Sequence, residues 1–172
     1  KKPLEGLPAT YVEDPSEAET LEIWMLDQLQ KLEVVLSYTI FRDCDAIARS
    51  VRFVNQGEKV LFLDRAMSLS LDFPDADYES VQLSGSWARE RSIVTRPLQP
   101  GVTAVSSMRG NSSHQHNPFL ALKRKHTTEH TGDAYGFSLV YSGNFLAQAE
   151  VDNYNVLRVM LGINPFGFRW KL

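Results

Sequence analysis

Apolar and polar residues alternate along most of this chain with the period of two that is typical of β-strands. Leu21, Ile23 and Met25 share one face of a first expected strand, and the same pattern runs from Leu32 to Ile40 after a turn at residues 28–30. The alternation resumes from Ile47 to Phe53, beyond the polar turn at residues 42–45. These three segments predict a meander of hairpins.

The longest alternating run, Leu61 to Phe73, exceeds the usual strand length of about 5 to 6 residues, so we expect a bend near Arg65. Shorter strands are expected at residues 78–84, 87–95, 102–108, 136–141, 145–151 and 156–161. No window keeps a helical period for more than about two turns. The pattern therefore predicts an all-β fold built from antiparallel strands.

Residues 1–19 carry three prolines and no periodicity, so we expect an extended lead-in, followed by one β-domain over residues 20–172. The start lacks an initiator Met and the end stops in the aromatic-rich NPFGFRWKL, so both ends are expected to be cut from a longer chain. The single cysteine, Cys44, excludes an internal disulfide and favours a cytoplasmic location. A net charge of −3 argues against nucleic-acid binding, and no apolar run reaches membrane-spanning length.

Chemistry-capable side chains are densest in RGNSSHQHNPFLA, residues 109–121, where His114 and His116 would share a face on a strand. A metal-dependent, cupin-like barrel is one interpretation, but the cationic Lys123 to Lys125 next to His126 and His130 opposes it. The alternative is a loop whose polar residues hold backbone or a neighbouring surface. We favour the loop, and we expect neither a metal nor another cofactor.

Trp87, Arg89 and Arg91 form a different candidate, because an aromatic ring beside guanidinium groups can stack on a sugar and donate hydrogen bonds to it. Core burial is the competing interpretation for Trp87. Asp75 with Asp77, or Glu79 with Glu90, could form an acid and base pair, but the spacing shows no convergence.

The stretch SSMRGNSSHQHNPFLAL, with LDRAMSLSLDFP, LSGSWARER and VLRVMLGINPFGFRWKL, resembles the N-terminal β-domain of glycoside hydrolase family 36 α-galactosidases. The resemblance implies an antiparallel β-supersandwich, galactose-mutarotase-like, that precedes a catalytic (β/α)8 barrel. It also implies a parent enzyme that removes terminal α-1,6-linked galactose from melibiose and raffinose with retention, and that forms a homo-oligomer.

The catalytic aspartates of that family belong to the barrel, and the Lys-Trp-Asp motif is absent from this chain, so we expect no catalytic residue here. The fragment alone is predicted to be inactive and to support its own barrel and the oligomer. The expected interdomain packing residues lie in the histidine-bearing stretch; they are Arg109, His114, His116, Asn117 and Phe119. An autonomous carbohydrate-binding sandwich remains the alternative.

Overall fold

The computed structural model describes all 172 residues, which form antiparallel β-strands and one short 3-10 helix. The all-β class and the antiparallel pairing that the alternation predicts are confirmed. No helix of the length and hydrophobicity that a membrane crossing demands is found among its elements. The chain divides into two compact units: unit 1 comprises Lys1–Ser68 and Phe168–Leu172, and unit 2 comprises Leu69–Gly167.

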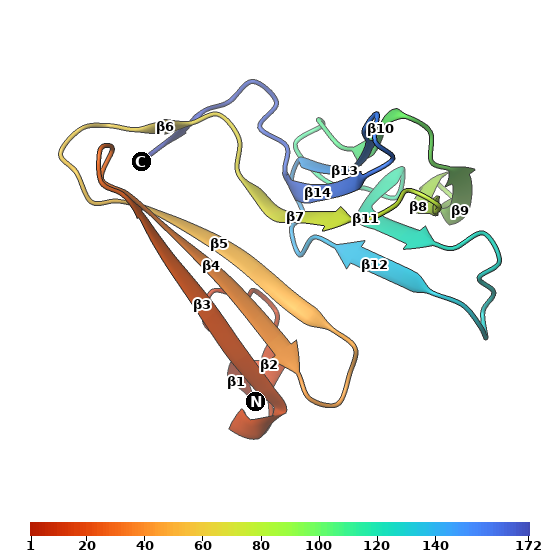
Figure 1. The fold of residues 1–172 in the computed structure, drawn as a ribbon, viewed down its shortest axis with the longest axis horizontal. Helices are drawn as coiled ribbons and strands as arrows, with labels where there is room; N and C mark the ends of the chain where they lie inside the picture. The colour runs from red at the N-terminus through yellow and green to blue at the C-terminus, as the bar shows by residue number, and fades with distance from the viewer. The chain divides into compact units, whose positions relative to one another are not determined.

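Unit 1 is built on a three-stranded meander in which β3 (Ala18–Asp27), β4 (Leu32–Phe41) and β5 (Ile47–Asn55) lie side by side in that order (Figure 1). The hairpin from β3 to β4 turns where Asp27 Oδ1 accepts hydrogen bonds from the amides of Leu29 and Gln30. Short side chain to backbone bonds of this kind stabilise turns, so the sequence sets the hairpin locally.

The first residues of the chain form a small structure of their own. A two-residue ladder joins β1 (Lys2–Pro3) to β2 (Tyr11–Val12), and the 3-10 helix η1 (Pro15–Glu17) follows with a capping box from Asp14 and Glu17. A Cβ built on Gly6 would lie 3.6 Å from Ser50 Oγ of β5. The lead-in therefore runs against the meander, and β6 (Phe62–Leu63) with β15 (Trp170–Lys171) completes the unit.

Unit 2 holds two four-stranded sheets. The first has the order β10 (Gly101–Ser106), β13 (Phe145–Val151), β14 (Leu157–Ile163) and β7 (Met67–Phe73). The second has the order β12 (Ala134–Ser138), β11 (His116–Lys123), β8 (Glu79–Ser86) and β9 (Arg89–Pro97). Both sheets contribute side chains to one buried apolar cluster, the arrangement that stabilises a β-sandwich.

The core of unit 2 explains why these strands alternate. Leu120 and Leu122 of β11 are 1% and 0% exposed, and Phe145 of β13 is 0% exposed. Phe73 and Tyr78 meet at 5.5 Å between ring centroids in an edge-to-face contact that favours aromatic pairs. The apolar half of each strand therefore supplies one continuous interior.

Two sequence predictions of strand position are corrected. The stretch that begins at His116 was expected to be a loop, yet it opens β11, a central strand of its sheet. Trp87 was placed inside a strand, yet it lies in the turn between β8 and β9. The bend expected near Arg65 is confirmed, because residues 64–66 separate β6 from β7.

Candidate functional site

The histidine loop, Ser107–Gln115, is held to a neighbouring turn mainly through backbone atoms. Gly110 N donates to Asn144 Oδ1 at 2.6 Å, and Ser112 N donates to Ser142 O at 2.8 Å. Gly110 has a φ of 85°, a conformation that glycine adopts without the strain of a Cβ. The loop is thus a fixed structure and not an open metal cradle.

The end of the histidine loop joins the β8 strand. Ser84 Oγ lies 3.3 Å from His116 Nδ1, and Gln82 Nε2 donates to Ser84 Oγ at 3.2 Å. Gly85 N donates to Gln115 O at 3.1 Å. A polar row therefore continues the interior face of the sheet beyond the last core leucine, Leu120.

Two amide oxygens in this region are buried without a hydrogen-bond partner, Gln115 Oε1 and Asn117 Oδ1. A buried acceptor that lacks a donor loses its bonds to water, which is costly unless something else donates to it. The side chain of Phe119 lies on the opposite face of β11 from Leu120. A Cβ built on Gly136 of β12 would lie 3.7 Å from Phe119 Cε2, so the ring lies next to this glycine. His114 and Arg109 are exposed in the loop.

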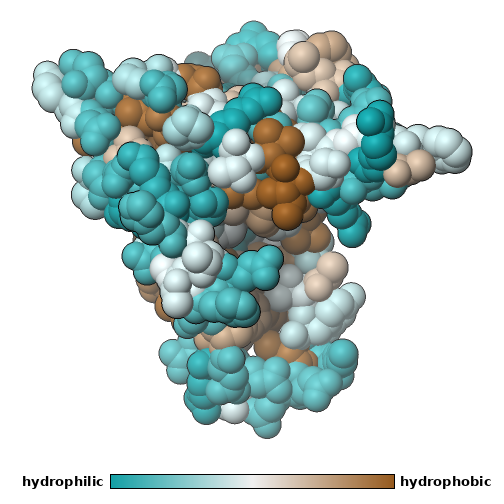
Figure 2. Space-filling view, turned by 90° about the vertical axis from the view of Figure 1, so that its right-hand side faces the viewer, coloured by the Kyte–Doolittle hydropathy of each residue, from teal (hydrophilic) through white to brown (hydrophobic).

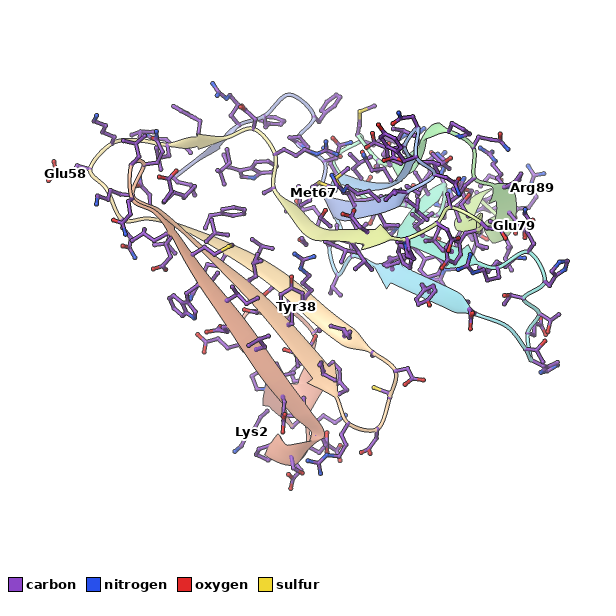
Figure 3. The ribbon with its side chains drawn as sticks, in the orientation of Figure 1. Lys2, Tyr38, Glu58, Met67, Glu79 and Arg89 are labelled. Atoms are coloured by element: carbon purple, nitrogen blue, oxygen red, sulfur yellow. The ribbon has the colours of Figure 1, made fainter.

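Trp87 stands on the tip of the β8–β9 hairpin with 84% of its surface exposed, so its burial in a core is excluded in this structure. Arg89 opens β9, as Figure 3 shows, and both Arg89 and Arg91 are exposed. An exposed indole next to arginine side chains can stack on a sugar ring and donate hydrogen bonds to its hydroxyls.

The hairpin tip has an unusual backbone. Ala88 and Arg91 adopt positive φ values of 62° and 57°, and the register shifts between Ser84 and Ser86. A Cβ on Gly85 would come within 2.2 Å of Arg89 O, so only glycine fits there. Glu90 Oε1 accepts a hydrogen bond from Ala88 N at 2.7 Å, which stabilises the turn.

The structure brings the two sequence-predicted groups to the same end of one sheet. The bonds from Gly85 and Ser84 to residues 115 and 116 connect the base of the Trp87 hairpin to the end of the histidine loop. Sequence reasoning missed Ser84, Gly85 and Gln115 as the link. Gly85, two residues before Trp87, was the available signal, because a glycine within a strand marks a close backbone approach.

The four histidines do not form a metal centre. His114 lies in a turn and His116 in β11, while His126 and His130 are exposed in the segment between β11 and β12. No group of three or more His, Cys, Asp or Glu side chains is close enough to hold a metal ion. The two histidines therefore do not share a strand face, contrary to the metal interpretation.

The acidic residues that could act as an acid and base are paired with cations instead. Arg124 Nη1 lies 2.6 Å from Asp75 Oδ1, and Lys125 Nζ lies 2.7 Å from Asp77 Oδ1. The hydrogen bond from Arg124 lowers the pKa of Asp75, and the hydrogen bond from Lys125 lowers the pKa of Asp77. Both carboxyl groups are thereby held ionised, whereas a general acid needs a raised pKa.

The residues around Asp75 connect neighbouring segments of the fold. The Arg124 guanidinium carbon lies 3.8 Å from the centre of the Tyr78 ring, and burial raises the pKa of the Tyr78 hydroxyl. Lys123 Nζ lies 2.5 Å from Glu79 Oε2 at the start of β8, which Figure 3 labels. This cluster ties the end of β11 to the segment between β7 and β8.

A shallow groove lies in unit 1 with a volume of about 250 Å³. It is lined by Ser16, Glu17, Ala18, Glu19, Ile40 and Arg42. None of the candidate residues from the sequence lines it. Apolar side chains also reach the surface elsewhere, and Figure 2 shows them interspersed with polar ones.

Comparison with known proteins gives a match over the whole chain. The family model described as glycosyl hydrolase family 36 N-terminal domain matches residues 1–172. α-Galactosidase AgaA of Geobacillus stearothermophilus is 58% identical over 172 residues, which are 100% of this chain and 24% of that protein. α-Galactosidase Mel36A of Lactobacillus acidophilus is 42% identical with the same coverage.

Solved structures agree with these relatives. The crystal structure of AgaA matches with a TM-score of 0.95 and 57% identity, over 100% of this chain and 24% of that one. An α-galactosidase from Lactobacillus brevis matches with a TM-score of 0.94 and 46% identity, over 100% and 23%. The chain thus spans about a quarter of the length of the relatives it matches. It belongs to the family of glycosyl hydrolase family 36 N-terminal domains.

Proposed function

We propose that this chain is the non-catalytic N-terminal domain of a retaining α-galactosidase that hydrolyses terminal α-1,6-galactosides such as melibiose and raffinose. The match to family 36 N-terminal domains over residues 1–172 carries the proposal. Variants of AgaA, which are 57% identical to this chain, have been crystallised in complexes with stachyose and with raffinose. Sugars of the same kind are therefore the substrates we assign to the parent enzyme.

The role of the domain is to support the catalytic (β/α)8 barrel of its own polypeptide. The carboxylates at Asp75 and Asp77 are held by cations, which fits a domain that leaves the chemistry to another part of the protein. A glycosidase needs two carboxyl groups that face each other across the substrate, with one of them available as an acid.

The packing surface we assign to the barrel consists of Arg109, His114, His116, Asn117 and Phe119. The exposed ring of His116 supports this assignment, because it offers a hydrogen-bonding group at the start of β11 to a neighbouring domain. The exposed side chains of Arg109 and His114 supply further polar partners at the rim. The same domain contributes to a homo-oligomer of the parent, located in the cytoplasm, where the exposed thiol of Cys44 stays reduced.

An activity measurement tests the proposal. The 172-residue chain should release no nitrophenol from a nitrophenyl α-galactoside, whereas the longer protein that contains it should do so at a readily measured rate. Turnover by the purified chain would contradict the non-catalytic assignment. Absence of turnover by the longer, folded protein would contradict the assignment of the parent as an α-galactosidase.

A second candidate function, an autonomous sugar site at Trp87, Arg89 and Arg91, rests on the 84% exposure of Trp87. Millimolar melibiose or raffinose should then change the tryptophan fluorescence of the chain, and Trp87→Phe should remove the change. Trp24→Phe is the matched control, because Trp24 is also exposed, at 57%, but lies in unit 1. A titration without any fluorescence change would exclude this candidate.

A further inference from the structure

The β3 strand presents apolar side chains to solvent on both of its faces. Leu21, Ile23 and Met25 point to one face and are 61%, 41% and 44% exposed. Trp24 and Leu26 point to the other face and are 57% and 42% exposed. A solvated strand usually keeps one polar face, so exposure on both faces indicates a strand that is covered in its working state.

β3 is also an open edge. It is the first strand of the order β3-β4-β5, and Figure 1 shows it at the side of that sheet. Its pairing with β4 is continuous from Ala18 to Asp27, with no bulge, and the strand contains no proline or lysine. Every second residue of an antiparallel edge strand turns its backbone donor and acceptor outward. Such an edge is a template for a further strand.

The charge around the edge specifies what kind of strand fits. Between residues 3 and 30 the sequence holds seven acidic residues and no lysine, arginine or histidine. Three of these acids, Glu19, Glu22 and Asp27, lie on β3 itself. None of the six ion pairs from Lys1–Glu13 to Arg169–Asp64 includes them, and the cation next to β3, Arg52 of β5, lies over the Trp24 ring with its guanidinium carbon 5.4 Å from the ring centre. Glu22 accepts only neutral donors, from Trp24 Nε1 and Ser37 Oγ.

The pairings of β3 with a second copy of β3 that overlap most are disfavoured. The two antiparallel registers with the greatest overlap around a two-fold axis place Glu22 opposite Glu22, or Glu19 opposite Asp27. Like charges directly opposite each other on paired strands are destabilising. The edge therefore calls for a strand with cationic residues, from a source other than the same segment of another molecule.

We propose that, in the longer protein, a β-strand from the polypeptide that follows Leu172 pairs along β3 and places lysine or arginine side chains opposite its carboxylates. The inference rests on the proposed function only in assuming that the protein continues. The chain covers 24% of AgaA, so relatives hold enough further sequence to supply such a strand. Apolar side chains of the added strand cover Leu21, Ile23 and Met25.

Amide hydrogen exchange tests the pairing directly. In the longer protein, the outward-facing amides of β3, every second one in residues 18–27, should exchange about a hundredfold more slowly than in the 172-residue chain, because an added strand binds them. The amides of β4, which are paired on both sides in the chain itself, are the internal control. Fast exchange of β3 in the longer protein, or equal protection in both forms, would overturn the proposal.

A charge reversal provides an independent arm. Glu19→Lys should lower the Tm of the longer protein by about 3 °C or more and leave the Tm of the 172-residue chain unchanged, because the Glu19 side chain is exposed on β3. Glu129→Lys, at an exposed residue of unit 2, is the control and should change neither. An equal effect of Glu19→Lys in both forms would refute the inference. Loss of an oligomer without a fall in monomer stability would assign the edge to a second copy instead.

The two arms are separate from the activity test. If the longer protein has no α-galactosidase activity but protects β3, the proposed function fails and this inference holds. If the longer protein is active but leaves β3 unprotected, the inference fails and the proposed function holds.

Discussion

Replacement of Leu122 by alanine should destabilise the chain strongly. Leu122 lies in β11, which the sequence pattern did not predict as a strand. Leu122 is 0% exposed and belongs to the core cluster of unit 2, on the central strand β11. Truncation of a fully buried leucine removes its transfer free energy and leaves a cavity, which together cost about 3 kcal/mol. Its cross-strand neighbours, Ser80 and Tyr135, are fixed by the ladders on both sides and cannot close the cavity.

Urea denaturation followed by far-UV circular dichroism measures the free energy of unfolding for the Leu122→Ala variant. Ile93→Ala is the matched control, because Ile93 lies in the same sheet but is 73% exposed, and its truncation should change the stability by less than about 0.5 kcal/mol. If the two units unfold in separate transitions, only that of unit 2 should move. A loss below about 1 kcal/mol, or one equal to the Ile93→Ala loss, would refute the assignment of this core.

Three further outcomes follow from the geometry. Gly85→Ala should speed amide exchange at the β8–β9 turn, since its Cβ would meet Arg89 O at 2.2 Å, whereas Gly136→Ala, with its nearest contact at 3.7 Å, should not. The pKa of Asp75 is lowered by its guanidinium partner, so this pair stabilises the fold above the unfolded-state pKa of about 3.9 and is lost as pH falls through the lower folded value. Asp75→Asn should therefore make the free energy of unfolding depend less on pH below about pH 4. A variant whose free energy of unfolding falls with acid as steeply as that of the original chain would contradict this prediction. In the longer protein, His116→Ala should lower thermal stability or assembly before turnover, and loss of turnover with normal stability and assembly would contradict the packing role.

The turns of unit 1 were predictable because their chemistry is local. Asp27 Oδ1 accepts hydrogen bonds from the amides of Leu29 and Gln30, so the turn expected at residues 28–30 depends only on neighbours in sequence. The break at residues 64–66 was predictable from strand length alone. Predictions that depend on residues a few positions apart are confirmed in both cases.

The strand β11 was missed because it does not alternate. Its residues Pro118 to Leu122 form an almost continuous apolar run, and the register against β8 shifts between His116 and Leu120. A bulge and a strand with two half-buried faces both remove the period of two. The link at Gly85 was missed for another reason: its amide bonds to Gln115 O, and the sequence pattern does not show which strands pair across some thirty residues.

The pairing of β6 with β15 has a consequence for synthesis on the ribosome. Leu63 is opposite Trp170, and Leu61 and Leu172 exchange two backbone hydrogen bonds, although unit 2 lies between them in sequence. Unit 2 is contiguous and can begin to fold as soon as it leaves the exit tunnel. Unit 1 gains its last strand only after the final residues of this chain have emerged. Nascent chains that stall before Trp170 therefore expose the β6 segment without its partner strand, whereas residues 69–167 of unit 2 have already been synthesised.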